Sequence, residues 1–345
     1  MLDNLPVIQL NSVSKTFHQP KQVVQALKDV SLSINNSEIY GLIGVNGSGK
    51  TTLAKIISTL LIPDCGRVLV LEIDALSFPG KVKEHIGISL GEGRSFYFRL
   101  TAEQNLEFFG TMLEIPPKKL KKRINELLEL LDLKWANKTP YMEFSSGMKR
   151  KLDLARAMLA YPDIYILDEP TNGIDPLSQD VIRSMIFNLK KEGKTILLIT
   201  HNLYEANILC DRVGILDKGV LLWQGSIEDF SEHKETSILE CSFKESSYDS
   251  NSNYSSNSNT NFTLTESLIS ELSNLPFVKK ITKNCYDNGY QIFFSKGNGG
   301  LNKLLSFVSS KDNLILERIN LLTPTIEDIF REFVKVGESK DNKYA

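Results

Sequence analysis

A glycine-rich loop in the first part of the chain has the residue types needed to bind phosphate. Residues 44–52 read GVNGSGKTT and match the pattern G-x-x-x-x-G-K-[ST]. Glycines let backbone N–H groups turn inward around an anion, and the helix expected next adds its positive N-terminal end. We expect the Lys50 ammonium to reach the β- and γ-phosphates of a nucleotide and the Thr51 hydroxyl to bind Mg²⁺. The residues expected to hold the nucleotide are Gly44, Val45, Asn46, Gly47, Ser48, Gly49, Lys50, Thr51 and Thr52.

Two carboxylates and a histidine further along the chain could complete this chemistry. Residues 164–169 read IYILDE, an apolar strand that ends in Asp168 and Glu169. An α/β sheet presents groups to its ligand at the carboxyl ends of such strands. We expect Asp168 to hold Mg²⁺, directly or through water, and Glu169 to orient and deprotonate the water that attacks the phosphate. His201 ends the next apolar strand and is expected to contact the γ-phosphate, although a lone histidine at a strand end is usually structural.

The elements around these motifs predict an α/β domain with a mainly parallel core sheet. Two runs, 164–170 and 195–201, are almost wholly apolar, which is typical of strands buried on both faces of a parallel sheet. A helix is expected between them, and an amphipathic helix is expected over 118–133. A strand is expected before the glycine-rich loop and a helix after it, at 38–44 and 52–61.

A further stretch, residues 143–159, reads EFSSGMKRKLDLARAML. By itself it describes a serine-capped helix with a basic face. Lys149, Arg150 and Lys151 are read mostly as a solvated face, with a phosphate or interface contact as the alternative.

The composition is typical of an ordinary globular protein and predicts no general attraction to nucleic acid. Of 345 residues, 41% are hydrophobic and 24% charged, with a formal net charge of −2. The four cysteines lie far apart, which argues against a zinc site or a disulfide framework. The N-terminus lacks the layout of a signal peptide, and no apolar run approaches the roughly 20 residues needed to span a bilayer. We therefore expect contact with a membrane only through a partner.

The carboxy-terminal third has a different organisation. Residues 246–261 read SSYDSNSNYSSNSNTN, a composition that predicts a flexible insertion because it cannot bury apolar surface. The segments around it follow the order β-α-β-β-α-β, which is that of a ferredoxin-like unit. A last helix is expected in TIEDIFREFVK.

The motifs of residues 1 to about 230, in this order, resemble those of ATP-binding-cassette (ABC) ATPases. The glycine-rich loop resembles the Walker A motif of that family, residues 164–169 its Walker B motif, and His201 its switch histidine. Residues 172–175, which end in Asp175, resemble its D-loop. The resemblance implies ATP with Mg²⁺ as the ligand and places Phe17 against adenine; a core phenylalanine near a strand end is the alternative for Phe17.

The resemblance also gives residues 145–148 a function. They occupy the position of the family signature LSGGQ, so Ser145, Ser146 and Gly147 would contact the ATP of a second cassette in a head-to-tail dimer. A helix N-terminus with free N–H groups and hydroxyls suits a γ-phosphate. Two residues depart from the signature, because Ser146 replaces a glycine and Met148 replaces glutamine. Signatures ending in SGM with basic residues after them are similar to those of exporters with ABC-2-type permeases.

A second departure lies in the Q-loop. The family places a glutamine where this chain has Gly91 and Glu92. Glu92 is expected to bind Mg²⁺ or water in its place, although it adds negative charge beside a polyphosphate. The aromatic residues that follow, in RSFYFRL, would either face a permease or be buried in a helical subdomain.

The resemblance implies a fold of two parts. The first is an ABC cassette over 1–235, with a mainly parallel core sheet, an antiparallel β-subdomain and a helical subdomain at about 95–160. The second is a small α+β domain over 236–335, similar to the extension of drug-resistance-type export ATPases, followed by a flexible tail at 336–345. We expect this domain to regulate or stabilise the dimer without catalysing a reaction.

The function implied is ATP hydrolysis that drives a separate ABC-2-type membrane permease. The partners would be that multi-spanning permease and a second cassette subunit, as a homodimer, at the cytoplasmic face of the cell membrane, with no nucleic acid. The alternative is a soluble ABC ATPase that acts on ribosomes or DNA. A degenerate cassette that binds ATP without hydrolysing it is a third reading, which the intact Asp168, Glu169 and His201 oppose.

Overall fold

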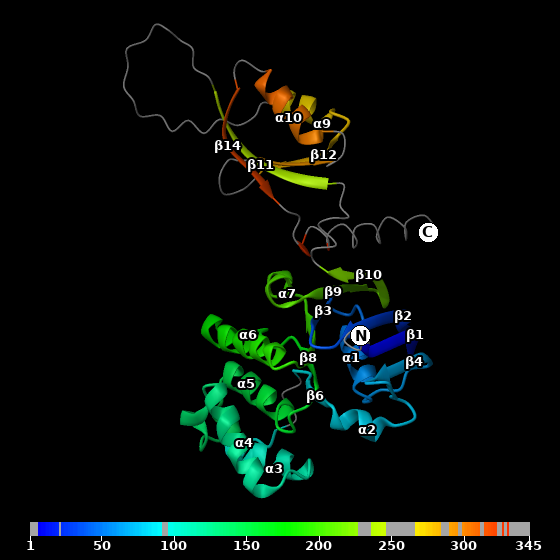
Figure 1. The fold of residues 1–345 in the computed structure, drawn as a ribbon, viewed down its shortest axis with the longest axis vertical. Coiled ribbons are helices and arrows are strands. Elements are labelled where there is room, and N and C mark those ends of the chain that lie inside the picture. Colours follow the sequence, from blue (N-terminus) through cyan, green and yellow to red (C-terminus); the bar gives the residue numbers. More distant parts are fainter. Residues whose placement is uncertain are drawn as a thin grey trace. The chain divides into compact units, whose positions relative to one another are not determined.

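The chain forms two compact units in the computed structural model (Figure 1). One is Met1–Ile227 with Phe330–Ala345, and the other is Glu228–Ile329. Glu92, the serine- and asparagine-rich insertion, the tail and most of the expected last helix lie outside the described residues. The structure describes residues 6–20, 22–91, 96–226, 236–245, 266–283, 290–295, 299–310, 314–322, 326–327 and 330.

A six-stranded, mainly parallel sheet forms the centre of the first unit, in the order β10-β9-β3-β8-β7-β6. Five of its strands run parallel, and β10 pairs antiparallel with β9 at one edge. All residues of β3, β7 and β8 are buried, as the apolar runs predict. The strands are β3 (Ile39–Ile43), β6 (Ile86–Ser89), β7 (Ile164–Asp168), β8 (Thr195–Thr200), β9 (Arg212–Asp217) and β10 (Val220–Ser226).

The register of these strands brings the sequence motifs to one edge of the sheet. Ile43 at the end of β3 pairs with Thr200 at the end of β8, and Asp168 at the end of β7 pairs with Ile199. The glycine-rich loop, the two carboxylates and His201 therefore leave the sheet from neighbouring positions, although more than 100 residues separate the first motif from the others.

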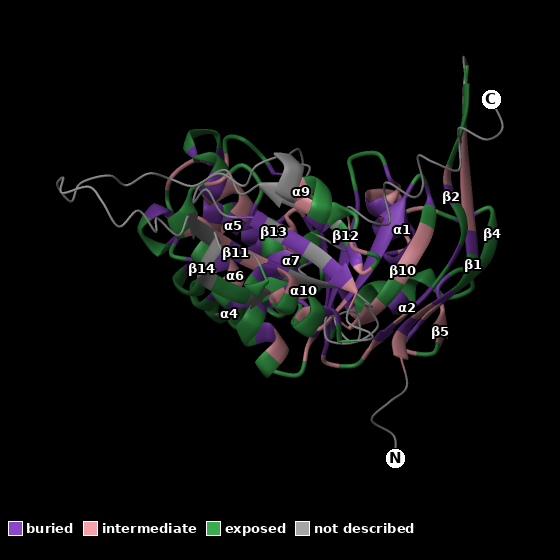
Figure 2. Ribbon diagram, turned by 90° about the horizontal axis from the view of Figure 1, so that it is seen from above, coloured by how far each residue is buried: buried purple, intermediate pink, exposed green. Residues whose placement is uncertain are grey.

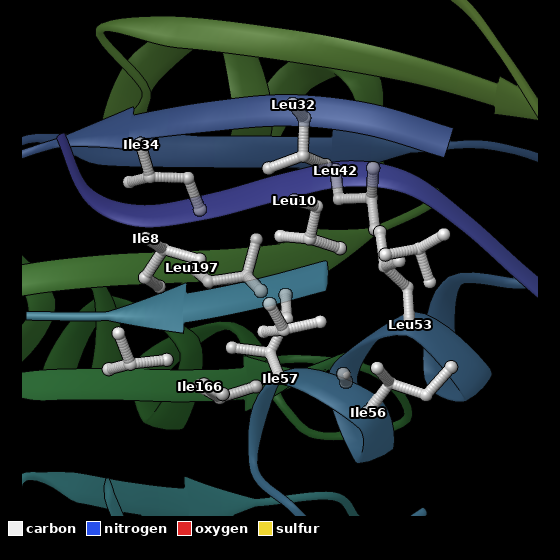
Figure 3. Close-up of a cluster of buried hydrophobic side chains, with 14 of the residues drawn as sticks. Ile8, Leu10, Leu32, Ile34, Leu42, Leu53, Ile56, Ile57, Ile166 and Leu197 are labelled. Carbon is white, nitrogen blue, oxygen red and sulfur yellow. The ribbon is translucent and has the colours of Figure 1, made fainter. Parts of the chain in front are cut away.

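An antiparallel sheet and helix α1 (Lys50–Ile57) pack against the central sheet. The antiparallel sheet has the order β2-β1-β4-β5, from β1 (Pro6–Gln19), β2 (Gln22–Asn35), β4 (Cys65–Val70) and β5 (Ile73–Asp74). Side chains of both sheets and of α1 form one core (Figure 3), in which Leu53 and Ile57 of α1 lie among Leu10, Leu42 and Ile166. This burial holds the first turn of α1, and with it Lys50 and Thr51, at the sheet edge.

Four of the remaining helices of the first unit begin at a side-chain cap. Thr101 and Gln104 form a capping box at α3, and Ser145, Asp175 and Asn202 cap α5, α6 and α7. Helix α1 is largely buried and α4 is largely exposed (Figure 2). The helices are α2 (Pro79–Glu84), α3 (Ala102–Met112), α4 (Pro117–Leu130), α5 (Ser146–Ala157), α6 (Pro176–Lys191) and α7 (Leu203–Leu209). In the described part of the chain, every helix is too short or too polar to cross a bilayer.

The aromatic segment before α3 divides between the two environments considered for it. Phe96 is buried, with its ring stacked on Tyr141 at 4.9 Å between centroids. Tyr97 and Phe98 are 50% and 58% exposed.

The second unit is a four-stranded antiparallel sheet with two helices. Its sheet order is β12-β13-β11-β14, and every pair is antiparallel. With its β-α-β-β-α-β element order, this is a ferredoxin-like arrangement. Leu239, Leu272, Ile292, Phe294 and Leu304 belong to its own core. The elements are β11 (Thr236–Glu245), α9 (Glu266–Ser273), β12 (Val278–Lys283), β13 (Tyr290–Ser295), α10 (Gly300–Ser309) and β14 (Leu314–Leu322).

Candidate functional site

The glycine-rich loop between β3 and α1 is shaped to accept an anion. Gly47 and Gly49 have φ of +81° and +109°, in the left-handed region that favours glycine. Nothing lies within 4 Å of a Cβ built on Gly47, so the loop is open there. Gly49 is the N-cap of α1 and supplies no side-chain acceptor, and the buried Ser48 Oγ has no hydrogen-bond partner. The unpaired hydroxyl and uncapped helix end fit a phosphate group.

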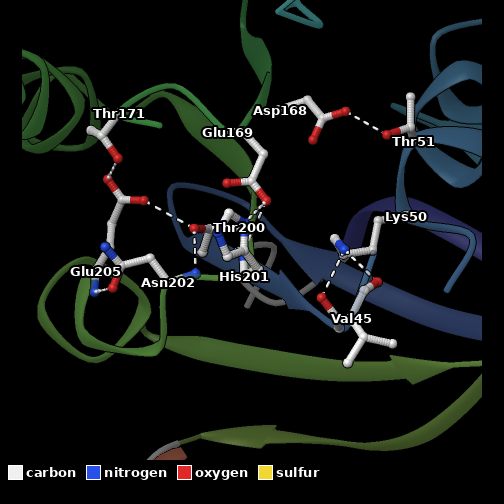
Figure 4. Close-up of polar contacts among 11 residues, drawn as sticks. Val45, Lys50, Thr51, Asp168, Glu169, Thr171, Thr200, His201, Asn202 and Glu205 are labelled. Atoms are coloured by element: carbon white, nitrogen blue, oxygen red, sulfur yellow. Dashed lines mark hydrogen bonds and ion pairs between the residues drawn. The ribbon is translucent and has the colours of Figure 1, made fainter. Parts of the chain in front are cut away.

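Lys50 points its ammonium into this loop (Figure 4). Nζ donates hydrogen bonds to the carbonyl oxygens of Gly44 and Val45, at 2.8 and 3.0 Å. Burial lowers the pKa of Lys50, and the charges of Glu169 and Asp168 oppose this shift. The cation thus lies where phosphate oxygens would enter the loop.

Thr51 and Asp168 form a pair that fits Mg²⁺. The Thr51 hydroxyl donates to Asp168 Oδ2 at 2.6 Å (Figure 4). Burial raises the pKa of Asp168, the Thr51 hydrogen bond lowers it, and the nearby Glu169 charge raises it. Within the described ranges, no group of three or more His, Cys, Asp or Glu side chains gathers to hold a metal. One carboxylate and one hydroxyl suit Mg²⁺, which takes most of its other ligands from water and phosphate.

Glu169 and His201 are joined by two hydrogen bonds. Glu169 Oε1 accepts from the His201 backbone N–H at 3.0 Å and lies 2.6 Å from Nδ1 (Figure 4). A carboxylate oxygen accepts hydrogen bonds, so the contact with Oε1 fits Nδ1 of His201 as the donor in this pair. Glu169 has φ of +50°, in the left-handed region that is unfavourable for a residue with a side chain.

Most of these groups line a cavity of about 580 Å³, but its lining does not include His201, Gly44, Val45 or Ser48. Its lining includes eight of the residues that the sequence predicted: Asn46, Gly47, Gly49, Lys50, Thr51, Thr52, Asp168 and Glu169. Phe17 is absent from the lining, but it pairs across the β1–β2 hairpin with Val24, which does line it.

The predicted signature residues lie elsewhere on the molecule, at the start of α5. Ser145 Oγ accepts a hydrogen bond from the Met148 N–H at 3.2 Å, which makes it the N-cap. Ser146 Oγ donates to the Gly173 carbonyl at 3.4 Å, so the signature contacts the expected D-loop. A Cβ on the buried Gly147 would come within 3.3 Å of Asp175 Oδ2.

Asp175 has a structural contact in the single chain. Its Oδ1 accepts from the Ser178 N–H at 2.9 Å, as the N-cap of α6. Ser145, Ser146, Gly147 and Asp175 therefore gather at one place, and none of them lines the cavity that holds Lys50 and Glu169.

The interpretation of residues 149–151 as a mostly solvated face is wrong for Lys151, whereas Arg150 is half-buried. Lys151 is buried, and Arg150 lines the 580 Å³ cavity. A charge run in the sequence does not show which face of the helix packs on the rest of the unit, and α5 turns this face inward.

A buried network beside His201 has no signature in the sequence. Glu205 in α7 accepts hydrogen bonds from the Thr171 hydroxyl at 2.7 Å and from the Thr200 hydroxyl at 3.1 Å (Figure 4). The Thr200 hydroxyl in turn accepts from the Asn202 N–H at 3.0 Å. The network joins the segment after Glu169 to the segment that carries His201. Other cavity residues that the sequence did not single out are Val24, Gln25, Ala26, Lys28, Leu90, Gly91, Arg150, Lys218 and Gly219.

Known proteins are similar to this chain over about two thirds of its length. The family described as ABC transporter matches residues 27–172. The ABC transporter ATP-binding protein NatA of Bacillus subtilis is 36% identical over 233 residues, which cover 68% of this chain and 95% of NatA. The doxorubicin resistance ATP-binding protein DrrA of Mycobacterium tuberculosis is 36% identical over 238 residues, 69% of this chain and 71% of DrrA.

A solved structure agrees with this assignment. The dimeric, post-hydrolysis ATP-binding cassette MJ0796 bound to ADP and Pi has a TM-score of 0.60 and 26% sequence identity, over 64% of this chain and 98% of that one. The fold class expected from the sequence is thus confirmed. The chain belongs to the ABC transporter family, as an ATP-binding member that hydrolyses ATP with Mg²⁺.

Proposed function

We propose that the chain is the ATPase subunit of an ABC-2-type exporter and drives a separate permease at the cytoplasmic face of the membrane. The observation that carries this proposal is the 36% identity to DrrA, a resistance ATP-binding protein, over 69% of this chain. The alternative of a soluble factor acting on ribosomes or nucleic acid has no support among these relatives. The formal net charge of −2 also offers no general attraction to nucleic acid.

Glu169 is the general base in this proposal. It takes a proton from the attacking water while the bond between the γ-phosphorus and the bridging oxygen to the β-phosphate breaks. The two hydrogen bonds from His201 hold the carboxylate in place, and Nε2 of His201 faces the γ-phosphate. Lys50 exchanges its contacts with the Gly44 and Val45 carbonyls for phosphate oxygens.

Thr51 and Asp168 would hold Mg²⁺ in the same site. When bound, the ion neutralises charge on the β- and γ-phosphates. The short contact between the two side chains supports this assignment, since both oxygens already point to one place. Phe17 is proposed to flank adenine, next to the Val24 that lines the cavity.

We propose that the signature residues contact the ATP bound to a second copy of the chain. These residues are Ser145, Ser146 and Gly147. The support is their position: they gather with Asp175 at the start of α5 and do not line their own chain's cavity. A helix start that presents N–H groups and hydroxyls away from its own nucleotide suits a head-to-tail dimer.

The permease is proposed to dock at a groove of about 650 Å³ between the core sheet and the helical subdomain. Met112 and Leu113 at the end of α3 are 67% and 52% exposed there, and Leu60, which follows α1, is 54% exposed. Exposed apolar side chains around a groove are typical of protein interaction sites.

The test uses the full chain expressed with the multi-spanning protein encoded in the neighbouring reading frame. We expect the two to co-purify from detergent-solubilised membranes. Glu169→Gln should keep ATP binding but lower turnover by about a hundredfold or more, the scale of a lost general base. Glu192→Gln, at an exposed carboxylate after α6, is the matched control. Native turnover in Glu169→Gln would overturn the catalytic assignment, and a chain that sediments with ribosomes instead of a permease would overturn the exporter.

A further inference from the structure

Arg150 extends from α5 into the ATP cavity of its own chain. It lines the 580 Å³ cavity together with Asp168 and Glu169. It also lines an adjoining cavity of about 260 Å³, with Ser146 and Asn172. Arg150 therefore stands between the nucleotide site and the start of α5, four residues after the first residue of that helix.

The packing of α5 on β6 directs the Arg150 side chain towards the 580 Å³ cavity. Ser89 at the end of β6 donates a hydrogen bond to Asp153 Oδ2 at 2.5 Å, which ties α5 to the strand before Gly91. Residues three apart share one helix face, so Arg150 lies on the same side of α5 as Asp153. The inward face of α5 is therefore the one that carries the guanidinium.

Gly91 leaves the space that Arg150 occupies. A Cβ built on Gly91 would lie 2.3 Å from Nη1 of Arg150, and the φ of +69° also favours glycine. This is the region where the family places its Q-loop glutamine, so in this chain a cation from α5 occupies the neighbourhood of that side chain.

The Arg150 charge has no close partner among the described residues. No hydrogen bond or ion pair joins it to them, whereas Arg156, six residues further along α5, pairs with Asp153 at 2.7 Å. A half-buried guanidinium without a partner, in a cavity built for polyphosphate, is suited to bind a phosphate oxygen.

We propose that Arg150 binds the terminal phosphate of the ATP held by its own chain. Helix α5 then contacts two nucleotides, its own through Arg150 and that of a second copy through Ser145 and Gly147. The second contact rests on the dimer proposed above, and the first does not. Arg150 lines the same cavity as Asp168 and Glu169, which the proposed function places at the Mg²⁺ and at the attacking water beside the γ-phosphate. A nucleotide that lacks the γ-phosphate would therefore lose the contact with Arg150.

The test compares the affinities for ATP and ADP of purified, full-length chains. The chains carry Glu169→Gln so that ATP is not consumed, and fluorescent derivatives of the two nucleotides are titrated with Mg²⁺ present. Arg150→Ala should weaken ATP binding roughly tenfold and leave ADP binding nearly unchanged, since a charge-assisted contact to the γ-phosphate is lost. Arg150→Lys should recover part of the ATP affinity, because it restores the charge without the fork of donors.

Lys149→Ala is the matched control. Lys149 is the neighbouring cation on α5, lies 5.5 Å from the Tyr141 ring centroid and is absent from the 580 Å³ cavity. It should change neither affinity. Unchanged ATP affinity in Arg150→Ala, or an equal loss for ATP and ADP, would overturn the proposal. If Arg150→Ala does not fold, Arg150→Gln gives the same comparison. Neither measurement requires a permease. The proposal that the chain drives an exporter can therefore be disproved without affecting the proposed contact between Arg150 and ATP.

Discussion

At the scale of single residues, Glu205 shows how burial and hydrogen bonding oppose each other in one carboxyl group. The side chain is fully buried, which raises its pKa, while hydrogen bonds from Thr171 and Thr200 act to lower it. The net effect is a raised pKa in the folded state. Its hydroxyl partners link the segments that carry Glu169 and His201. The protonation state of Glu205 therefore affects the positions of both residues.

We predict that Glu205→Gln changes how stability depends on pH. The folded state holds the Glu205 proton to a higher pH than the unfolded state does. Its contribution to the free energy of unfolding is therefore fully present at low pH and is lost as pH rises through the raised pKa. In Glu205→Gln that loss disappears, so the variant should gain stability relative to the native chain over this window and then level off.

Denaturant unfolding at a series of pH values measures this difference. Glu192→Gln removes a carboxylate at an exposed position and is the matched control for the loss of one acidic side chain. A constant difference between Glu205→Gln and the native chain across the acidic range would contradict the prediction.

At the scale of elements, the junction of the glycine-rich loop and α1 depends on close backbone approach. A Cβ on Gly49 would lie 2.5 Å from the carbonyl oxygen of Ala26 in β2, and its φ of +109° is strained for any other residue. The loop therefore keeps its shape only while the antiparallel sheet and α1 stay in contact.

Gly49→Ala is expected to destabilise the chain by about 1–3 kcal/mol or more, through backbone strain and the clash with Ala26. It should also abolish ATP binding, because the loop must move away from β2. Gly80→Ala is the control, since nothing lies within 4 Å of a Cβ there and Gly80 lies in helix α2. That change should be neutral or stabilise by up to about 1 kcal/mol. Thermal unfolding and nucleotide titration measure both effects, and equal behaviour of the two variants would contradict this reasoning.

At the scale of the whole molecule, the apolar groove and the ATP cavity share Leu90 and Gly91. The segment after β6 therefore borders both the nucleotide and the proposed permease surface. A movement of this segment on ATP binding would directly change the surface that the permease is proposed to contact. The nucleotide site and the permease surface would then be coupled through Leu90 and Gly91.

Met112→Glu is expected to abolish co-purification with the permease while ATP turnover by the isolated chain stays unchanged. The charge would lie in the apolar groove, but Met112 does not line the ATP cavity. Trp135→Glu is the control, because Trp135 is 71% exposed and lies outside the groove. Loss of the permease in both variants, or in neither, would show that the groove is not the docking surface.

The sequence by itself determined the local chemistry and the class of fold. The glycine-rich loop is contiguous, and the strands before Glu169 and His201 are apolar throughout, so pattern and period were enough to predict the motifs and a parallel sheet. Once that sheet is parallel, its carboxyl ends meet at one edge, and the neighbourhood of Lys50, Asp168, Glu169 and His201 follows.

Only the tertiary structure decided the contacts made by packing between distant elements. The residues 149–151 are three cations in the sequence, yet one is buried and Arg150 enters a cavity, because Asp153 docks α5 on β6. Glu205 is one glutamate among many, and its partners are 34 and 5 residues away. Such contacts depend on how whole faces of helices and sheets pack together. The spacing of apolar residues in the sequence shows which residues share one face of an element, but it does not show which other element that face packs against.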